Sequence, residues 1–196
     1  MRIFCFLTFS VLIWFGSWGC SQRHTVTIDP ALPVSRSDLG RSRTIGLEVA
    51  DARPSNLIAK WKGTFNFRRF TINPDPNLVE TIYQKISKGL RIVDYNPKRL
   101  TMNMNRTLKV EIQQIKSIYH KRGPQMGVKV HVQFRATCEN KNSTPPSVYK
   151  KSFSGNRNRD PIPPTSFPNE KMVNDTISGV LGKLFADRKL LHCLAQ

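Results

Sequence analysis

Recognisable catalytic motifs are absent from this sequence. It has no Cys-x-x-Cys pair, no His-Glu-x-x-His segment and no glycine-rich phosphate loop, so the usual scaffolds for metal or nucleotide chemistry are missing. Ser147 and Lys150 match Ser-x-x-Lys, but the Ser-Asp-Asn and Lys-Thr-Gly elements that this motif needs do not occur. The histidines are scattered, and Asp160 and Glu170 form no visible carboxylate pair. We therefore expect no enzyme, with no catalytic residues, no metal and no cofactor.

Long apolar runs are also lacking, with one exception at the N-terminus. Arg2 precedes an almost unbroken apolar stretch over residues 3–16, and Ser17-Trp18-Gly19 forms a small-x-small cleavage site, a combination typical of an export signal. A permanent membrane span needs about 20 apolar residues, and polar residues 21–23 come too early for one. We predict that residues 1–19 are a signal peptide that is removed from the mature protein.

Cys20 follows directly after the predicted cleavage point. The pair Gly19-Cys20 resembles the lipobox of bacterial lipoproteins, which implies that the Cys20 thiol carries fatty acyl chains such as palmitate and becomes the mature N-terminus. More than one chain anchors a protein stably, because each buried methylene contributes about 0.8 kcal/mol. Ser21 is not the aspartate that often retains lipoproteins in the inner membrane, which favours the periplasmic face of the outer membrane. Ser17 and Trp18 depart from the usual lipobox, so simple secretion is the alternative.

Acidic residues are scarce. The chain has 13 Asp and Glu against 31 Lys and Arg, a formal net charge of +18, and such a surface attracts anions. Residues 61–70 interleave bases with aromatics as RNA-binding sheets do, but the export signal opposes a nucleic-acid partner. The expected partners are instead an anionic lipid, a glycan or an envelope protein. A solvated basic surface without a partner is the alternative.

Cysteine is rare in the mature chain. Cys5 leaves with the signal and Cys20 carries lipid, so only Cys138 and Cys193 remain. A disulfide between them is permitted in an oxidising periplasm. Alternatively, Cys138 continues the apolar face of a strand and is a small buried hydrophobic residue. The sequence leaves both interpretations open, and we favour the second.

Hydrophobic periodicity predicts strands and one helix in the first two thirds of the chain. Residues 45–50 alternate as a half-buried strand, and residues 65–72 form a second strand with Phe65, Phe67, Phe70 and Ile72 facing the core. Residues 75–89 predict a helix that Asp75 caps, Pro76 begins and Gly89 ends. Residues 106–121 and 126–138 form a long hairpin around the turn 122–125, with a bulge near Gln113.

The last third predicts a strand, a loop and a helix. Residues 147–154 alternate as a short strand, and residues 155–169 are too rich in Pro, Asn and Arg for regular structure. From about Asn169, apolar residues recur at helical spacing. The fold class is therefore α+β, a mainly antiparallel sheet with two helices packed on one face. Residues 20–42 are expected to form an anchor and tether segment, and residues 43–196 a single periplasmic domain.

The order of these parts resembles the YajG family of bacterial outer-membrane lipoproteins. The resemblance rests on Cys20, the "TVTIDP" segment soon after it, the strand ending "VADARP", the hairpin, the "YKKSFSG" strand and the closing "MVNDTISGVLGKLFADRKL" helix. Asp51 and Arg53 fit an Asp-x-Arg motif at the strand end. The resemblance implies an anchored periplasmic domain of undefined role and brings no catalytic residues.

We expect a lipid-anchored, non-catalytic binding or accessory module of the envelope. The alternative is an accessory subunit of an envelope machine, such as a secretion channel, a lipid-transport complex or a peptidoglycan synthase, and less favoured is an envelope hydrolase. Contact with an anionic surface is expected from the bases around the predicted loop, Lys150, Lys151, Arg157 and Arg159. The closing helix is expected to be structural.

Overall fold

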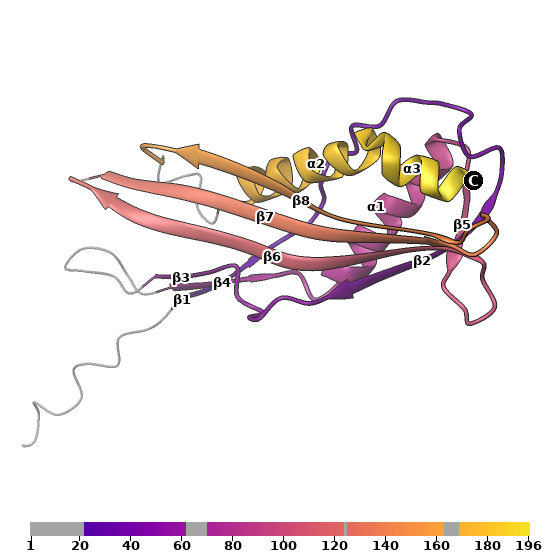
Figure 1. The fold of residues 1–196 in the computed structure, drawn as a ribbon. Coiled ribbons are helices and arrows are strands. Elements are labelled where there is room, and N and C mark those ends of the chain that lie inside the picture. The colour runs from indigo at the N-terminus through magenta and orange to yellow at the C-terminus, as the bar shows by residue number, and fades with distance from the viewer. Residues whose placement is uncertain (1–21, 62–69, 124, 163–168) are drawn as a thin grey trace, which may run out of the picture.

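The computed structural model describes residues 22–61, 70–123, 125–162 and 169–196, and its fold is α+β (Figure 1). Its elements follow one another as β1 (Gln22–Val26), β2 (Thr44–Asp51), β3 (Ala59–Trp61), β4 (Phe70–Pro74), α1 (Leu78–Ile92), β5 (Asn96–Arg99), β6 (Arg106–Arg122), β7 (Gln125–Asn140), β8 (Ser147–Arg159), α2 (Glu170–Ala186) and α3 (Arg188–Ala195).

The larger sheet has the strand order β5-β2-β6-β7-β8. The predicted long hairpin is confirmed as β6 and β7, and their register shifts between Ile112 and Gln114, where the bulge is expected. β8 pairs with β7 antiparallel along its whole length, whereas β2 runs parallel to both β5 and β6. Alternation within β7 buries one face of the sheet, from Val128 to Cys138, and leaves the other face open.

A smaller sheet, of order β1-β4-β3, continues the larger one beside the second half of β6. The Ser117 backbone N–H donates to the Ile58 carbonyl oxygen at 2.8 Å, next to β3. Phe70 and Ile72 are buried as expected, while Phe65 and Phe67 lie outside the described residues.

β1 lies within the segment predicted to be a tether. It pairs with β4 from Gln22 onward, and Val26 and Ile28 belong to the hydrophobic core. Sequence periodicity missed this strand because its five residues include Gln, Arg and His. The folded domain therefore starts two residues after Cys20.

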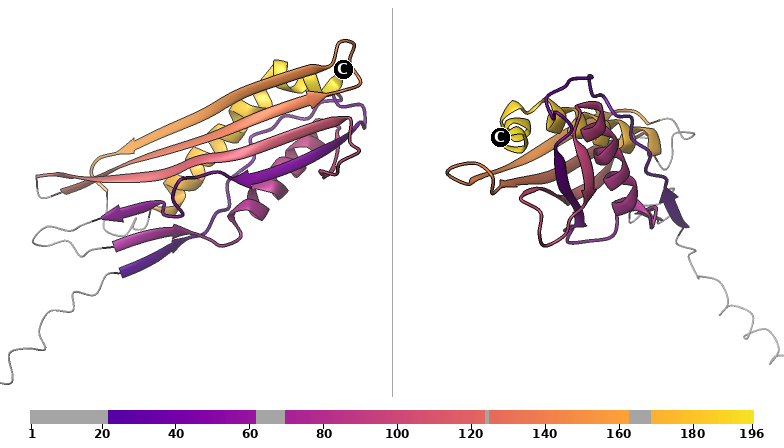
Figure 2. Two further views of the ribbon diagram at one scale, coloured as in Figure 1. Left: turned by 60° about the horizontal axis from the view of Figure 1, so that its bottom comes forward. Right: turned by 90° about the vertical axis from the view of Figure 1, so that its right-hand side faces the viewer.

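The helices all cover one face of the larger sheet, and Figure 2 shows the strands of the open face in front of them. The predicted first helix is confirmed as α1, but it begins at Leu78 after Asn77 and not at Pro76 after Asp75, and it continues past Gly89 to Ile92. A Cβ atom on Gly89 would lie 2.3 Å from the Phe185 ring of α2. Glycine is thus required here for close helix packing and not for termination.

The predicted closing helix is confirmed as α2, and its apolar side chains are buried, Ile177, Val180 and Leu184 among them. It ends at Asp187, which is extended (φ −78°, ψ 99°) and whose carboxylate accepts a hydrogen bond from the Leu190 backbone N–H of α3 at 2.9 Å. The chain thus forms a third helix where the sequence indicated one continuous helix.

Cys138 and Cys193 form a disulfide, with Cα atoms 6.4 Å apart. The favoured interpretation of Cys138 as a free buried thiol is therefore wrong, although the residue is fully buried. The bond joins β7 to α3. Local sequence pattern could not decide the question, because bridging depends on how α3 packs against the sheet.

β8 is longer than predicted. It continues through Arg159, so residues 155–159 are strand and not the irregular loop. Gly155 permits this, because a Cβ atom there would lie 3.0 Å from the Val180 side chain of α2. The helix therefore packs directly on the strand, and the pairing with β7 outweighs the low strand propensity of Asn and Gly.

Candidate functional site

The residues predicted for the anchor, Gly19 and Cys20, lie outside the described residues. The structure does show where the first described residue, Gln22, lies in the fold. Gln22 pairs with Phe70, Phe70 pairs with Trp61, and the Phe70 and Tyr119 rings are 5.1 Å apart near the tip of the β6–β7 hairpin. The chain therefore enters the domain at the end of the molecule to which the hairpin tip points, away from the C-terminus (Figure 1).

The four bases predicted to contact an anionic surface all lie on β8 but do not form one patch. Phe153 faces the helices, and strand alternation puts Lys151, Arg157 and Arg159 on that side and Lys150 on the open face. β8 is the edge of the larger sheet. Charged side chains on an exposed edge strand prevent it from pairing with another chain, which explains why bases are concentrated there.

Lys151 connects β8 to the break between the last two helices. Its Nζ lies 2.5 Å from the Asp187 carboxylate, and the Tyr149 hydroxyl donates to the same oxygen at 3.3 Å. Burial by itself raises the pKa of Asp187, but hydrogen bonds from Lys151 and the Leu190 backbone N–H outweigh it, and the pKa is lowered. Lys151 thus has a structural role.

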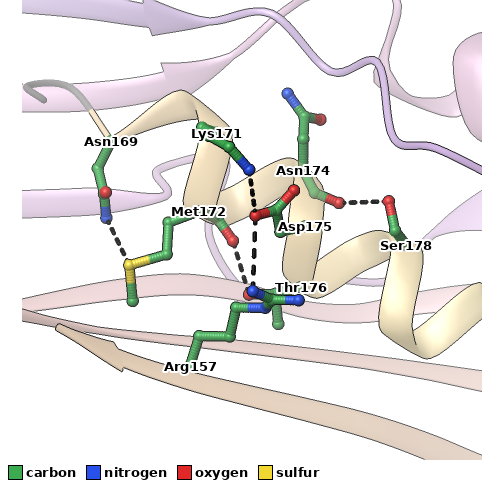
Figure 3. Close-up of polar contacts among 8 residues, drawn as sticks. All are labelled: Arg157, Asn169, Lys171, Met172, Asn174, Asp175, Thr176 and Ser178. Carbon is green, nitrogen blue, oxygen red and sulfur yellow. Dashed lines mark hydrogen bonds and ion pairs between the residues drawn. The ribbon is translucent and has the colours of Figure 1, made fainter.

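Arg157 is also engaged within the fold. Figure 3 shows its guanidinium beside Asp175 of α2, at 3.5 Å, with Lys171 at 2.7 Å from the same carboxylate. Thr176, one residue on, donates to the Met172 carbonyl oxygen at 2.7 Å. Of the four predicted bases, only Lys150 and Arg159 have no ion pair among the described residues.

Four exposed bases share the open face near the hairpin tip. Arg23 and Lys60 both pair with Thr71, on the face opposite the buried Phe70 and Ile72. Lys129 of β7 pairs with Ile118 of β6. Lys116 lies two residues before Ile118 on β6, so its side chain points to the same face. We call Arg23, Lys60, Lys116, Lys129 and Ile118 the basic face. Within the described part of the chain none of its four bases has an ion pair.

A groove of about 470 Å³ opens on the basic face, between β6 and the chain segment that joins β2 to β3. Its lining includes Arg53, Lys60 and Lys116, together with apolar residues such as Leu57 and Ile118, and none of the described residues that line it is acidic. Ile118 is 47% exposed, one of few large apolar side chains at the described surface.

Asp51 and Arg53, the Asp-x-Arg pair, hold this segment at the end of β2. The Arg53 guanidinium donates two hydrogen bonds to the Asp51 carboxylate, at 2.7 and 2.8 Å, and these lower the pKa of Asp51. The Arg53 side chain is only 4% exposed, and its Nη1 atom has no hydrogen-bond partner among the described residues. One N–H group of the buried Arg53 guanidinium, beside the groove, therefore makes no hydrogen bond with the described residues.

A second, open hollow of about 600 Å³ lies between β2, α1 and residues 100–104. Arg99 spans it, with an ion pair to Glu80 at 2.7 Å and its guanidinium 4.6 Å above the Tyr83 ring. Hydrogen bonds from Gln84 and Arg99 lower the pKa of Glu80. Charges of both signs line this hollow and are already paired.

No three His, Cys, Asp or Glu side chains among the described residues gather as they would around a metal ion. His120 and Asp160 meet at 3.0 Å across Gly127, where a Cβ atom would collide with the Asp160 carboxylate. No nucleophilic side chain is seen bonded to this pair in the described ranges. Of the helices in these ranges, none is both long and apolar enough for a membrane span.

Comparisons with known proteins place the chain among lipoproteins. A family model described as "Uncharacterized lipoprotein" matches residues 30–195, and no protein with a curated description matches significantly. A protein of Xanthomonas campestris is similar in structure, at 10% identity and a TM-score of 0.46 over 90% of this chain and 96% of that one.

Two further solved structures are named as lipoproteins. Lipoprotein GNA1162 of Neisseria meningitidis has 9% identity and a TM-score of 0.41 over 74% of this chain and 99% of its own. A minor lipoprotein of Acinetobacter baumannii has 9% identity and a TM-score of 0.40, covering 79% of this chain and 94% of the other.

Proposed function

Because the chain belongs to the family of uncharacterized lipoproteins of the YajG type, we propose that it is anchored through acylated Cys20 to the periplasmic face of the outer membrane. There it acts as a non-catalytic binding or accessory module. The observation that carries the proposal is the match of residues 30–195 to a lipoprotein family. β1 starts at Gln22, which leaves almost no tether after Cys20. Two residues span at most about 7 Å, so an acyl anchor on Cys20 holds the hairpin tip next to the bilayer.

The non-catalytic role is supported by how the polar side chains are used. Asp51, Asp175 and Asp187 hold the fold together through ion pairs with bases. Within the described ranges the histidine and carboxylate that do meet, His120 and Asp160, are beside a glycine and not beside a nucleophile. This arrangement favours a binding module over an envelope hydrolase.

We expect mass spectrometry of the mature protein to find Cys20 at the N-terminus, carrying acyl chains. The protein should fractionate with the outer membrane and stay there in high salt, because acyl insertion is apolar. The matched control is Cys20→Ser, which should leave an uncleaved or soluble chain. An unmodified Cys20, or a wild-type chain free in the periplasm, would contradict the anchor.

An accessory role in a larger envelope assembly is the second candidate. It is favoured by the open sheet face, where Val148 is 69% exposed on the edge strand β8. Affinity capture from cross-linked envelopes, compared with capture by a Val148→Lys variant, tests it. A partner that is retained by the wild type and lost by this variant would support the accessory role. Identical captures would remove the support that Val148 gives it.

A further inference from the structure

We propose that the basic face is the surface by which the domain lies on an anionic phospholipid bilayer. The proposal rests on the anchoring of Cys20 and goes beyond it, because an acyl chain alone does not orient a domain. The side chains that contact the phosphate head groups are Arg23, Lys60, Lys116 and Lys129. The far end of the sheet then points away from the bilayer into the periplasm.

The first argument is position. Arg23 is the second residue of β1, and Lys60 lies beside it across Thr71. Cys20 is two residues before Gln22, so the anchored end of the chain lies within about 7 Å of the domain. That is less than the screening length of about 8 Å at physiological salt. Arg23, next to the anchored end, is therefore within reach of the head-group charge, and the other three bases extend from it across β3, β6 and β7.

The second argument is charge. The acidic side chains on neighbouring parts of these strands are each engaged in a contact of their own: Asp51 with Arg53, Glu111 with Arg135 and Asp160 with His120. The bases of the basic face have no such partner within the described ranges. At the other end of the open face, Lys109 is paired with Glu48. Near the anchored end, four bases without an ion pair among the described residues therefore share the open face, while bases such as Lys98 and Lys150 stand unpaired at its far end.

The third argument is the groove. It lies within the basic face, and its lining combines three cationic side chains with apolar ones, Leu57 and Ile118 among them. The Nη1 atom of Arg53 is buried there without a partner among the described residues. That atom is shielded from solvent, so the cationic side chains that a phosphate can reach in the groove are those of Lys60 and Lys116. Ile118 can contact the glycerol and upper acyl region of a phospholipid.

The test uses the lipidated full-length chain reconstituted in vesicles of phosphatidylcholine alone or mixed with phosphatidylglycerol. A membrane-impermeant amine reagent followed by mass spectrometry measures the modification rate of each lysine. Lys60, Lys116 and Lys129 should react more slowly in the anionic vesicles than in the neutral ones. Their rates should become equal in about 1 M salt, where the screening length is about 3 Å. Lys98 should react equally in both.

Lys98 is a suitable internal control because of its place in the sheet. It pairs with Gly46, which pairs with Thr107 on β6, while the basic face includes Ile118 on the same strand. At about 3.3 Å per residue the two sites are about 35 Å apart. A bilayer that contacts only the anchored end of the open face therefore does not reach Lys98.

Two double variants sharpen the test. Each basic residue near an anionic surface strengthens membrane association by about fivefold. The variant with Lys60→Ser and Lys129→Ser should therefore lower the ratio of bilayer-bound to free domain, measured from the protection of Lys116, by about 25-fold. Lys98→Ser with Lys150→Ser removes the same charge away from the basic face and should leave protection at Lys116 unchanged.

Equal lysine reactivity in both vesicles, or protection of Lys98 in place of Lys60, would overturn the proposal. An equal loss of protection in the two double variants would also overturn it. Net charge, and not the position of the bases, would then determine the contact. Failure of the anchor is a different result, because the chain would then not float with neutral vesicles. Flotation with both vesicle types together with identical footprints would leave the anchor intact and remove the orienting role of the basic face.

Discussion

Leu184 is the residue that most directly tests whether the closing helix is structural. It is fully buried in α2, within the core formed by the helices and the larger sheet. We expect Leu184→Ala to lower the free energy of unfolding by about 2 to 5 kcal/mol, measured by urea unfolding, because it removes buried methyl groups and leaves a cavity. Leu39→Ala is the control, since Leu39 is exposed and its change should cost under about 0.5 kcal/mol. Equal midpoints for the two variants would contradict burial of Leu184.

Asp187 should make stability depend on pH. Its pKa is lowered in the folded state by hydrogen bonds that outweigh burial, so the unfolded chain binds this proton more readily than the folded one. Its stabilisation is therefore present above the unfolded pKa of about 3.9 and is lost as the pH falls through the folded pKa. Urea unfolding between about pH 6 and pH 2 should show a shallower loss for Asp187→Asn than for the wild type.

The matched control for this prediction is Lys151→Gln. It removes one donor to Asp187 but leaves the Tyr149 hydroxyl and the Leu190 backbone N–H in place. Its pH dependence should lie between those of the wild type and Asp187→Asn. If the wild type and Asp187→Asn lose stability in parallel as the pH falls, the ion pair to Lys151 has no energetic role.

At the scale of elements, the disulfide connects β7 to α3. Cys138 and Cys193 are 55 residues apart, and closing a loop of that length stabilises the folded state by about 4 kcal/mol through the entropy of the unfolded chain. Urea unfolding with and without reductant should show a loss of this order. The Cys138→Ala/Cys193→Ala variant, which should unfold at the same midpoint with or without reductant, is the control. An unchanged wild-type midpoint after complete reduction would contradict a stabilising bond.

The elements that the sequence predicted well are those whose cause is local. The hairpin, its bulge and the apolar stripes of α1 and α2 follow from alternation and helical spacing over neighbouring residues. Gly89 and Gly155 were misinterpreted because each accommodates a side chain of α2, Phe185 in one case and Val180 in the other. No pattern around a glycine indicates a contact made so much later in the chain.

At the scale of the whole molecule, the basic face could not be read from the sequence. Its bases come from β1, β3, β6 and β7, and no two of them are near neighbours in the chain. The bases on β8 were easier to notice because all four lie within ten residues of the chain, yet the fold uses Lys151 and Arg157 in its own ion pairs. Clustering along the chain and clustering on the surface are different properties.

The late position of α2, α3 and Cys193 affects how such a chain is exported. A chain that has been synthesised only as far as Arg159 already has every strand of the larger sheet, but nothing yet covers β7 and β8, and Gly89 has no Phe185 ring to pack against. Contacts that join distant parts of a chain form slowly. The precursor should therefore stay unfolded, and able to pass through a translocation pore, until α2 and α3 have been synthesised. Folding should follow once Cys193 reaches an oxidising compartment.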